Sequence, residues 1–158
     1  MVRLEARTAN LEGENEITIR DLIKASLRLR PDRIIVGEVR DAAAIDMLSA
    51  MGTGHDGSLS TGHANSAEDM LARLETMVLM GVQLPLEAIR RQIASGIEIL
   101  VHLGRGEDGS RRVEEIAEIT GMEEDEIKTV SLFRREYGRG LQKTGELVHR
   151  EKLEGKTG

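Results

Sequence analysis

The sequence of 158 residues contains no cysteine and no tryptophan, and Phe133 and Tyr137 are its only aromatic residues. Without cysteine, the chain can form neither disulfide bonds nor thiolate metal sites. Its core must be filled by Leu, Ile and Val together with seven Met side chains. The lack of aromatic residues also disfavours a surface on which nucleic-acid bases stack.

Long apolar runs are lacking as well. No run approaches the roughly 20 residues that span a bilayer, and no basic start followed by an apolar segment resembles a signal peptide. The formal net charge is −6, which argues against direct binding of nucleic acid. We therefore expect a cytoplasmic protein whose contact with a membrane comes through a partner.

Short β-branched runs alternate with amphipathic stretches along the first two thirds of the chain. This order predicts an α/β fold with a parallel sheet and flanking helices, and alternation in 113–120 and 127–133 adds antiparallel C-terminal strands. The expected strands and helix starts are, in order, a strand at 2–4, a helix after Thr18, a strand at 33–37, a helix after Asp41, a strand at 58–61, a helix after Ser66, a helix near Pro85 and a strand at 97–103.

The last part of the chain differs in composition. From residue 134 to 158 it is basic, contains several glycines and has few large apolar residues. This composition predicts a weakly ordered tail. We therefore divide the chain into one domain over residues 1–133 and a tail over 134–158.

Glu38 follows the apolar run of residues 34–36 and a glycine. Ligands of parallel α/β sheets bind at the carboxyl ends of the strands, and a carboxylate there can polarise an attacking water. The alternative is an ordinary exposed glutamate that pairs with Arg40. Both interpretations stay open on this segment alone.

A second polar segment, residues 54–66, contains two of the four histidines among Gly, Ser, Thr and Asn. Small residues let backbone N–H groups approach a phosphate, and His63 can donate a hydrogen bond to a phosphate or to the glutamate. Two alternatives are a glycine-rich turn that caps the next helix at Asn65 or Ser66, and a zinc site made by His55, His63 and a carboxylate. The spacing of such a zinc site matches no common ligand pattern.

Arginines are concentrated in the first quarter of the chain, and their guanidinium groups match phosphate oxygens well. Surface ion pairs with nearby acids are the alternative. A phosphate-binding loop is missing from the sequence, which has no G-x-x-x-x-G-K-[ST] motif. Gly155, Lys156 and Thr157 do not form one, because Arg150 occupies the position of its first glycine.

Six segments together resemble the secretion ATPase superfamily, the hexameric traffic ATPases of type II and type IV secretion and type IV pili. The last two narrow the resemblance to the CpaF-like branch of tight-adherence (Tad/Flp) pilus assembly. The segments are ITIRDL at 17–22, LRLRPDRIIVGEVR at 27–40, TGHDGS at 53–58, HANS at 63–66, RLETMVLM at 73–80 and RRQIAS at 90–95.

This resemblance implies roles for particular residues. Glu38 is similar to the catalytic glutamate of the family's Walker B motif, and His63 to the γ-phosphate-sensing residue of its His box. Three arginines match positions near the nucleotide or the subunit interface: Arg7, Arg20 and Arg40. Supporting His-box positions are Gly54, His55, Asp56 and Gly57.

The resemblance further implies a partial RecA-like P-loop ATPase core that uses ATP and Mg²⁺, with the metal bound through ATP near Glu38 and by no protein ligand directly. Expected partners are copies of itself in a hexameric ring or full-length ATPase subunits, and an inner-membrane platform protein. The chain departs from the family in lacking the Walker A loop and the Asp box, so we expect a C-terminal part that is inactive by itself. The alternative is a non-hydrolysing regulatory half-domain that docks on full-length subunits.

Overall fold

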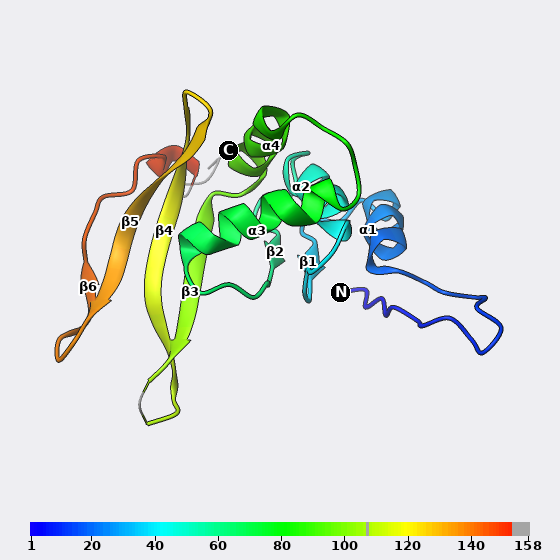
Figure 1. The fold of residues 1–158 in the computed structure, drawn as a ribbon, viewed down its shortest axis with the longest axis horizontal. Coiled ribbons are helices and arrows are strands. Elements are labelled where there is room, and N and C mark those ends of the chain that lie inside the picture. Colours follow the sequence, from blue (N-terminus) through cyan, green and yellow to red (C-terminus); the bar gives the residue numbers. More distant parts are fainter. Residues whose placement is uncertain (107, 153–158) are drawn as a thin grey trace.

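The computed structural model describes residues 1–106 and 108–152, which form two sheets and four α-helices (Figure 1). A short parallel sheet pairs β1 (Ile35–Val36) with β2 (Leu59–Ser60). A four-stranded antiparallel sheet has the order β3 (Ile99–Arg105), β4 (Arg111–Glu123), β5 (Glu126–Glu136) and β6 (Gly140–Lys143). The helices are α1 (Ile19–Arg28), α2 (Ala43–Met51), α3 (Ala67–Leu79) and α4 (Leu86–Gly96), and a 3₁₀ turn, η1, spans Arg150–Lys152.

This arrangement confirms the expected α/β class, with a parallel sheet and appended antiparallel strands. In Figure 1 the helices gather around the parallel sheet, and the antiparallel sheet stands beside them. Helices α3 and α4 contact β4 and so join the two parts. Among the described residues, no helix has the length and apolar character needed to cross a membrane.

Side chains just before the helices fix where two of them start. Thr18 forms a complete capping box with Asp21, and the hydroxyl of Ser66 accepts a hydrogen bond from the backbone N–H of Asp69 at 2.9 Å. The carboxylate of Asp41 accepts one from the backbone N–H of Ala43 at 2.8 Å. The caps at Thr18 and Ser66 confirm the helix starts predicted there, whereas the N-cap of α2 is Ala42, one residue after Asp41, and has no side-chain capping bond.

The core is aliphatic, as the scarcity of aromatic residues predicted. Its largest fully buried apolar side chains come from α2, α3 and α4, and they are Leu48, Leu74, Val78, Ile89 and Ile93. These three helices contact one another, and Val36 of β1 and Val39 just beyond it lie in the same buried cluster. The core therefore fixes the two loops that leave the parallel strands.

The N-terminal region differs from the expectation of a strand at 2–4, because those residues adopt no regular structure. Residues 7–17 instead form a hairpin, which we call the arm. Arg7 and Ile17 exchange two backbone hydrogen bonds of 2.9 Å at its base. Figure 1 shows the arm extending away from the rest of the chain on the side of α1.

The C-terminal region also differs from the expected weakly ordered tail. Residue 133 lies inside β5, and β6 pairs with β5 from Phe133↔Lys143 to Glu136↔Gly140. Residues 144–149, which we call the strap, then cross β5 and β4. Their contacts with Leu132 and Glu118 are long-range, so composition of the segment gave no sign of them. Residues 153–158 lie outside the described part of the chain.

Candidate functional site

The candidate site lies where the two parallel strands end. Beyond the paired residues of β1 and β2, the backbone N–H of Val39 donates to the carbonyl of Thr61 at 2.9 Å. The Thr61 hydroxyl donates to the carbonyl of Gly37 at 2.6 Å. These two bonds hold the chain on either side of Glu38 against the chain that leads into His63.

Glu38 and His63 meet at this edge. Glu38 Oε1 and His63 Nε2 are 3.2 Å apart, and the exposed fractions of the side chains are 38% for Glu38 and 83% for His63. The glutamate therefore pairs with His63. The alternative interpretation, an ordinary surface glutamate, predicted a pair with Arg40. Because the imidazole is largely open to solvent, an incoming ligand can reach both groups.

Gly62 allows this approach. A Cβ atom at this position would lie 2.6 Å from Met70 Cε and 3.6 Å from the carbonyl oxygen of Val39. A larger residue would therefore have to displace the flexible end of the Met70 side chain, which comes from α3. Its small size brings the histidine loop close to both the β1 segment and α3.

The residues at 54–57 shape the loop between α2 and β2. His55 Nδ1 donates to the carbonyl of Ala50 at 3.1 Å, at the end of α2. Gly54 and Gly57 have φ angles of 86° and 79°, which favour glycine. Asp56 is exposed. The Nδ1 atom of His55 is thus already engaged by the end of α2, which speaks against the zinc alternative.

Ser58 is a positioning residue that the sequence analysis did not single out. Its hydroxyl donates to the carbonyl of His55 at 2.7 Å and accepts from the backbone N–H of Ile34 at 2.9 Å. It therefore ties the loop of residues 54–57 to the strand that delivers Glu38. The signal was its place at the start of the expected strand, where a hydroxyl can replace a ladder bond.

The three arginines singled out by resemblance are not brought together. Arg7 Nε donates to the carbonyl of Asn15 at 2.8 Å within the arm. Arg20, on α1, forms an ion pair with Asp46 on α2. Arg40 is exposed, two residues beyond Glu38, and is the one of the three nearest to it along the chain.

Arg40 lines a groove of about 500 Å³ beside the candidate site, which we call the α3 groove. One stripe of α3 forms its long side, at the helical spacing of i, i+3, i+4, i+7 and i+8, with Met77 as its buried member. Arg73 projects from this stripe, and the sequence analysis missed its role as a groove residue. The full lining is Arg40, Ala64, Asn65, Asp69, Ala72, Arg73, Thr76, Met77 and Met80.

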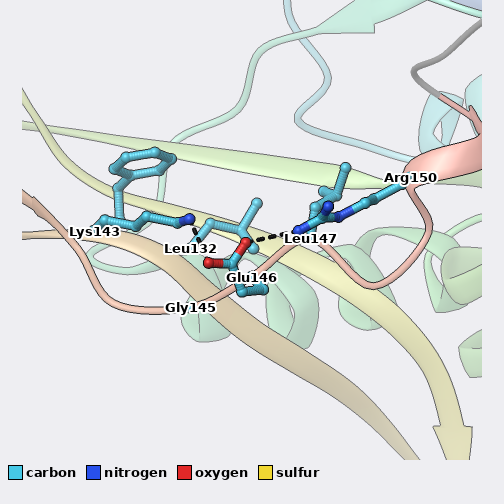
Figure 2. A pocket seen from close by; sticks show the side chains of 7 residues that line it. Leu132, Lys143, Gly145, Glu146, Leu147 and Arg150 are labelled. Carbon is cyan, nitrogen blue, oxygen red and sulfur yellow. Dashed lines mark hydrogen bonds and ion pairs between the residues drawn. The ribbon is translucent and has the colours of Figure 1, made fainter.

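A second hollow, of about 300 Å³, lies under the strap, far along the chain from the Glu38 edge. Figure 2 shows its apolar side chains, including Leu132 and Leu147, together with an ion-pair chain in which Glu146 contacts both Lys143 and Arg150. Its lining is Leu132, Phe133, Lys143, Gly145, Glu146, Leu147 and Arg150.

Glu118 fastens the strap and is 2% exposed. Its carboxylate accepts from the backbone N–H groups of Val148 and His149 at 2.7 and 2.8 Å, and from His149 Nδ1 at 3.0 Å. Burial by itself would raise the pKa of Glu118. The three donated hydrogen bonds together outweigh burial, so the pKa lies below its ordinary value.

The chemistry of the site is that of an acid and an imidazole at one sheet edge. A carboxylate and an exposed imidazole share one edge, whereas the sequence has no motif for a phosphate-binding loop. Within residues 1–106 and 108–152, no three His, Asp or Glu side chains gather to hold a metal ion.

Comparisons of the sequence and the structure with known proteins point to one family. The sequence model of a family described as type II/IV secretion system protein matches residues 3–137. "Putative conjugal transfer protein Rv3659c" of Mycobacterium tuberculosis is 41% identical over 138 residues, which cover 87% of this chain and 39% of that protein. Conjugal transfer protein TrbB of Rhizobium radiobacter is 38% identical over 120 residues, covering 76% of this chain and 36% of that protein.

A solved structure is also similar. The crystal structure of the VirB11 ATPase from the Brucella suis type IV secretion system, in complex with sulphate, superposes with a TM-score of 0.60 at 37% identity. The match covers 63% of this chain and 31% of that chain. This chain thus spans about two fifths or less of the length of these relatives.

Proposed function

Because the chain belongs to the family of type II/IV secretion system proteins, we propose that it supplies the hydrolytic residues of an ATP-driven secretion motor. One observation carries the proposal: Glu38 Oε1 and His63 Nε2 lie 3.2 Å apart at the carboxyl ends of two paired parallel strands. Ligands of α/β sheets bind at this edge. The related VirB11 protein is described as an ATPase of a type IV secretion system.

In this proposal Glu38 is the catalytic carboxylate. It accepts a hydrogen bond from the attacking water and orients the water in line with the γ-phosphate. The exposed His63 ring is close enough to Glu38 to share that water, and its Nε2–H can turn to a γ-phosphate oxygen. Mg²⁺ bound to ATP would neutralise the charge that develops on the phosphates. Thr61 and Gly37 hold the two loops together during turnover.

The phosphate-binding loop must come from residues other than these. Ile35 and Leu59 are opposite each other in register and are 68% and 61% exposed. Parallel sheets in proteins are normally covered on both faces, so these two side chains favour a further layer over β1 and β2. We propose that a segment carrying the phosphate-binding loop packs there and completes a RecA-like core.

The proposed function also includes an oligomeric assembly and a transport task. From the resemblance to the hexameric traffic ATPases, we propose a hexameric ring that acts on the cytoplasmic side of the membrane through an inner-membrane platform protein. The CpaF-like resemblance favours Tad/Flp pilus assembly as its task. A second candidate is conjugal transfer, which is favoured by the names of two relatives.

We propose that this chain supplies the hydrolytic residues and another segment supplies the phosphate-binding loop. The experiment that tests this separation joins this chain to the phosphate-binding half of a VirB11-type relative. We expect no ATP turnover by the chain alone and measurable turnover by the joined protein, followed as phosphate release. Tight ATP binding by the chain alone would overturn the claim that it lacks the phosphate cradle. A folded joined protein that binds ATP and never hydrolyses it would support the alternative of a regulatory half-domain.

A further inference from the structure

The arm, residues 7–17, is a hairpin whose base and turn are closed by hydrogen bonds within the arm itself. Its turn is closed by backbone bonds from Asn10 to Glu14 at 2.8 Å and from Gly13 to Asn10 at 3.0 Å. The side chain of Asn10 accepts two more bonds, from the backbone N–H groups of Glu12 and Glu14. A preformed loop loses little conformational entropy when it binds.

The surface that the arm presents is apolar at one point and acidic around it. Leu11 is fully exposed, with a relative accessibility of 108%. The carboxylates of Glu12, Glu14 and Glu16 form no ion pair within the described residues. The arm therefore offers one leucine and three free negative charges to a binding partner.

The α3 groove has the complementary character. Met77 lies at its floor and is 2% exposed, whereas Met80 is 66% exposed at its end. Methionine side chains adapt to apolar groups of varied shape. The guanidinium groups of Arg40 and Arg73 have no ion pair in the described part of the chain, and they outnumber the single acid of the groove, Asp69.

We propose that the arm of one copy of this chain docks into the α3 groove of a second copy. Leu11 would enter the groove above Met77, and the arm carboxylates would face Arg40 and Arg73. Complementary charge favours the correct register and disfavours contacts between two arms or two grooves. The arm and the groove are different surfaces, so the contact is heterologous and closes into a ring or continues as a filament.

This contact would place a neighbouring copy beside the Glu38–His63 edge, since Ala64 and Asn65 line the groove directly after His63. It requires no nucleotide. Its failure would therefore leave the proposed hydrolytic role untouched, and loss of hydrolysis would leave this contact untouched.

Site-directed cross-linking is a clean test because the natural chain has no cysteine. One preparation carries Leu11→Cys, and a second, of different length through an affinity tag, carries Ala72→Cys in the groove. The two are mixed without nucleotide and treated with a short bismaleimide. The matched control replaces Leu11→Cys with Tyr137→Cys, on the β5–β6 turn, because Tyr137 is 97% exposed.

We expect a cross-linked species between the long and short chains for Cys pairs at 11 and 72, and its loss in the Tyr137→Cys control. Equal yields from positions 11 and 137 would overturn the proposal. So would a cross-link that forms only within one chain carrying both Leu11→Cys and Ala72→Cys, because the arm would then fill its own groove.

Charge reversal provides the second readout. Adding Glu14→Arg to the arm chain, or Arg73→Glu to the groove chain, is expected to abolish the cross-link, and the two reversals together are expected to restore it. Circular dichroism confirms that each variant is folded. Failure of the double reversal to restore the cross-link of folded chains would show that Glu14 and Arg73 do not meet, and would overturn the assigned register.

Discussion

At the scale of single residues, the candidate site depends on two side chains of opposite exposure. Glu38 is partly sheltered by the ends of β1 and β2, whereas His63 is open to solvent. A sheltered carboxylate keeps a fixed direction, and an exposed imidazole can reorient toward an incoming anion. The difference suits a glutamate that holds water and a histidine that contacts phosphate.

His63→Ala tests the second role. In the joined protein that carries a phosphate-binding half, we expect a fall in turnover of about a hundredfold, because one hydrogen-bond donor to the developing charge is lost. ATP affinity should change little. His102→Ala, on β3 of the other sheet, removes an imidazole away from the site and should leave turnover unchanged. Equal rates for both variants would return His63 to a structural role in its loop.

Glu118 is the residue whose pH dependence follows from its surroundings. Its folded-state pKa is lowered, so its contribution to stability is present above the ordinary glutamate pKa of about 4.3 and is lost as pH falls through the folded value. At pH 7, Glu118→Gln leaves two N–H donors of the strap poorly matched and should cost about 1–3 kcal/mol. The stability difference between wild type and variant should shrink below about pH 4.

Urea unfolding followed at several pH values checks this expectation. Glu124→Gln, in the exposed turn between β4 and β5, is the matched control and should have little effect at any pH. A difference between wild type and Glu118→Gln that stays constant from pH 7 down to acid pH would contradict the account. It would mean that the carboxylate charge contributes nothing to fastening the strap.

At the scale of elements, the helix that follows His63 starts where it does because of one hydroxyl. Ser66 accepts from the backbone N–H of Asp69 at 2.9 Å and so caps α3. The helix in turn carries the groove stripe and packs Met70 against Gly62. A shift in the start of α3 would therefore displace the loop that presents His63.

Ser66→Ala is expected to lower the free energy of unfolding by about 1 kcal/mol, because an N-terminal backbone donor of α3 loses its partner. Chemical denaturation measures this change. Ser95→Ala, near the end of α4, is the control: its hydroxyl only bonds the carbonyl of Gln92 within the same helix, so the substitution should be close to neutral. A neutral Ser66→Ala would remove the cap as the determinant of the α3 start.

Elements differ in how far the sequence predicts them. The caps at Thr18 and Ser66 are local, because a hydroxyl and a backbone N–H three residues apart decide them. The strap was not predictable in this way, since Glu118 and its donor His149 are 31 residues apart. The turn of the arm had a local signal in Gly13, whose φ of 80° favours glycine.

At the scale of the whole molecule, the parallel sheet and the antiparallel sheet have different degrees of completeness. The antiparallel sheet has four strands and is fastened by the strap, whereas β1 and β2 contain two residues each. Two-stranded sheets are marginal by themselves, so the α2, α3 and α4 core must hold the parallel pair in place. The site thus lies on the part of the molecule that further packing layers would stabilise most.

The sequence was most informative about the position of the two site residues at one sheet edge. Glu38 and His63 each follow a β-branched or small-residue run, and neighbouring parallel strands end at one edge. The α3 groove needed the structure, because Arg40 and Arg73 come from segments that only packing brings together. The spacing of 69, 72, 73, 76, 77 and 80 along one helix stripe was the available signal.

The central claim is that Glu38 is the carboxylate that activates water. The most direct test measures ATP binding and steady-state turnover of the joined protein carrying Glu38→Gln, an isosteric change that removes the charge. We predict unchanged ATP affinity and a fall in turnover of about 10²–10⁴-fold. Turnover equal to that of the unsubstituted joined protein would contradict the account.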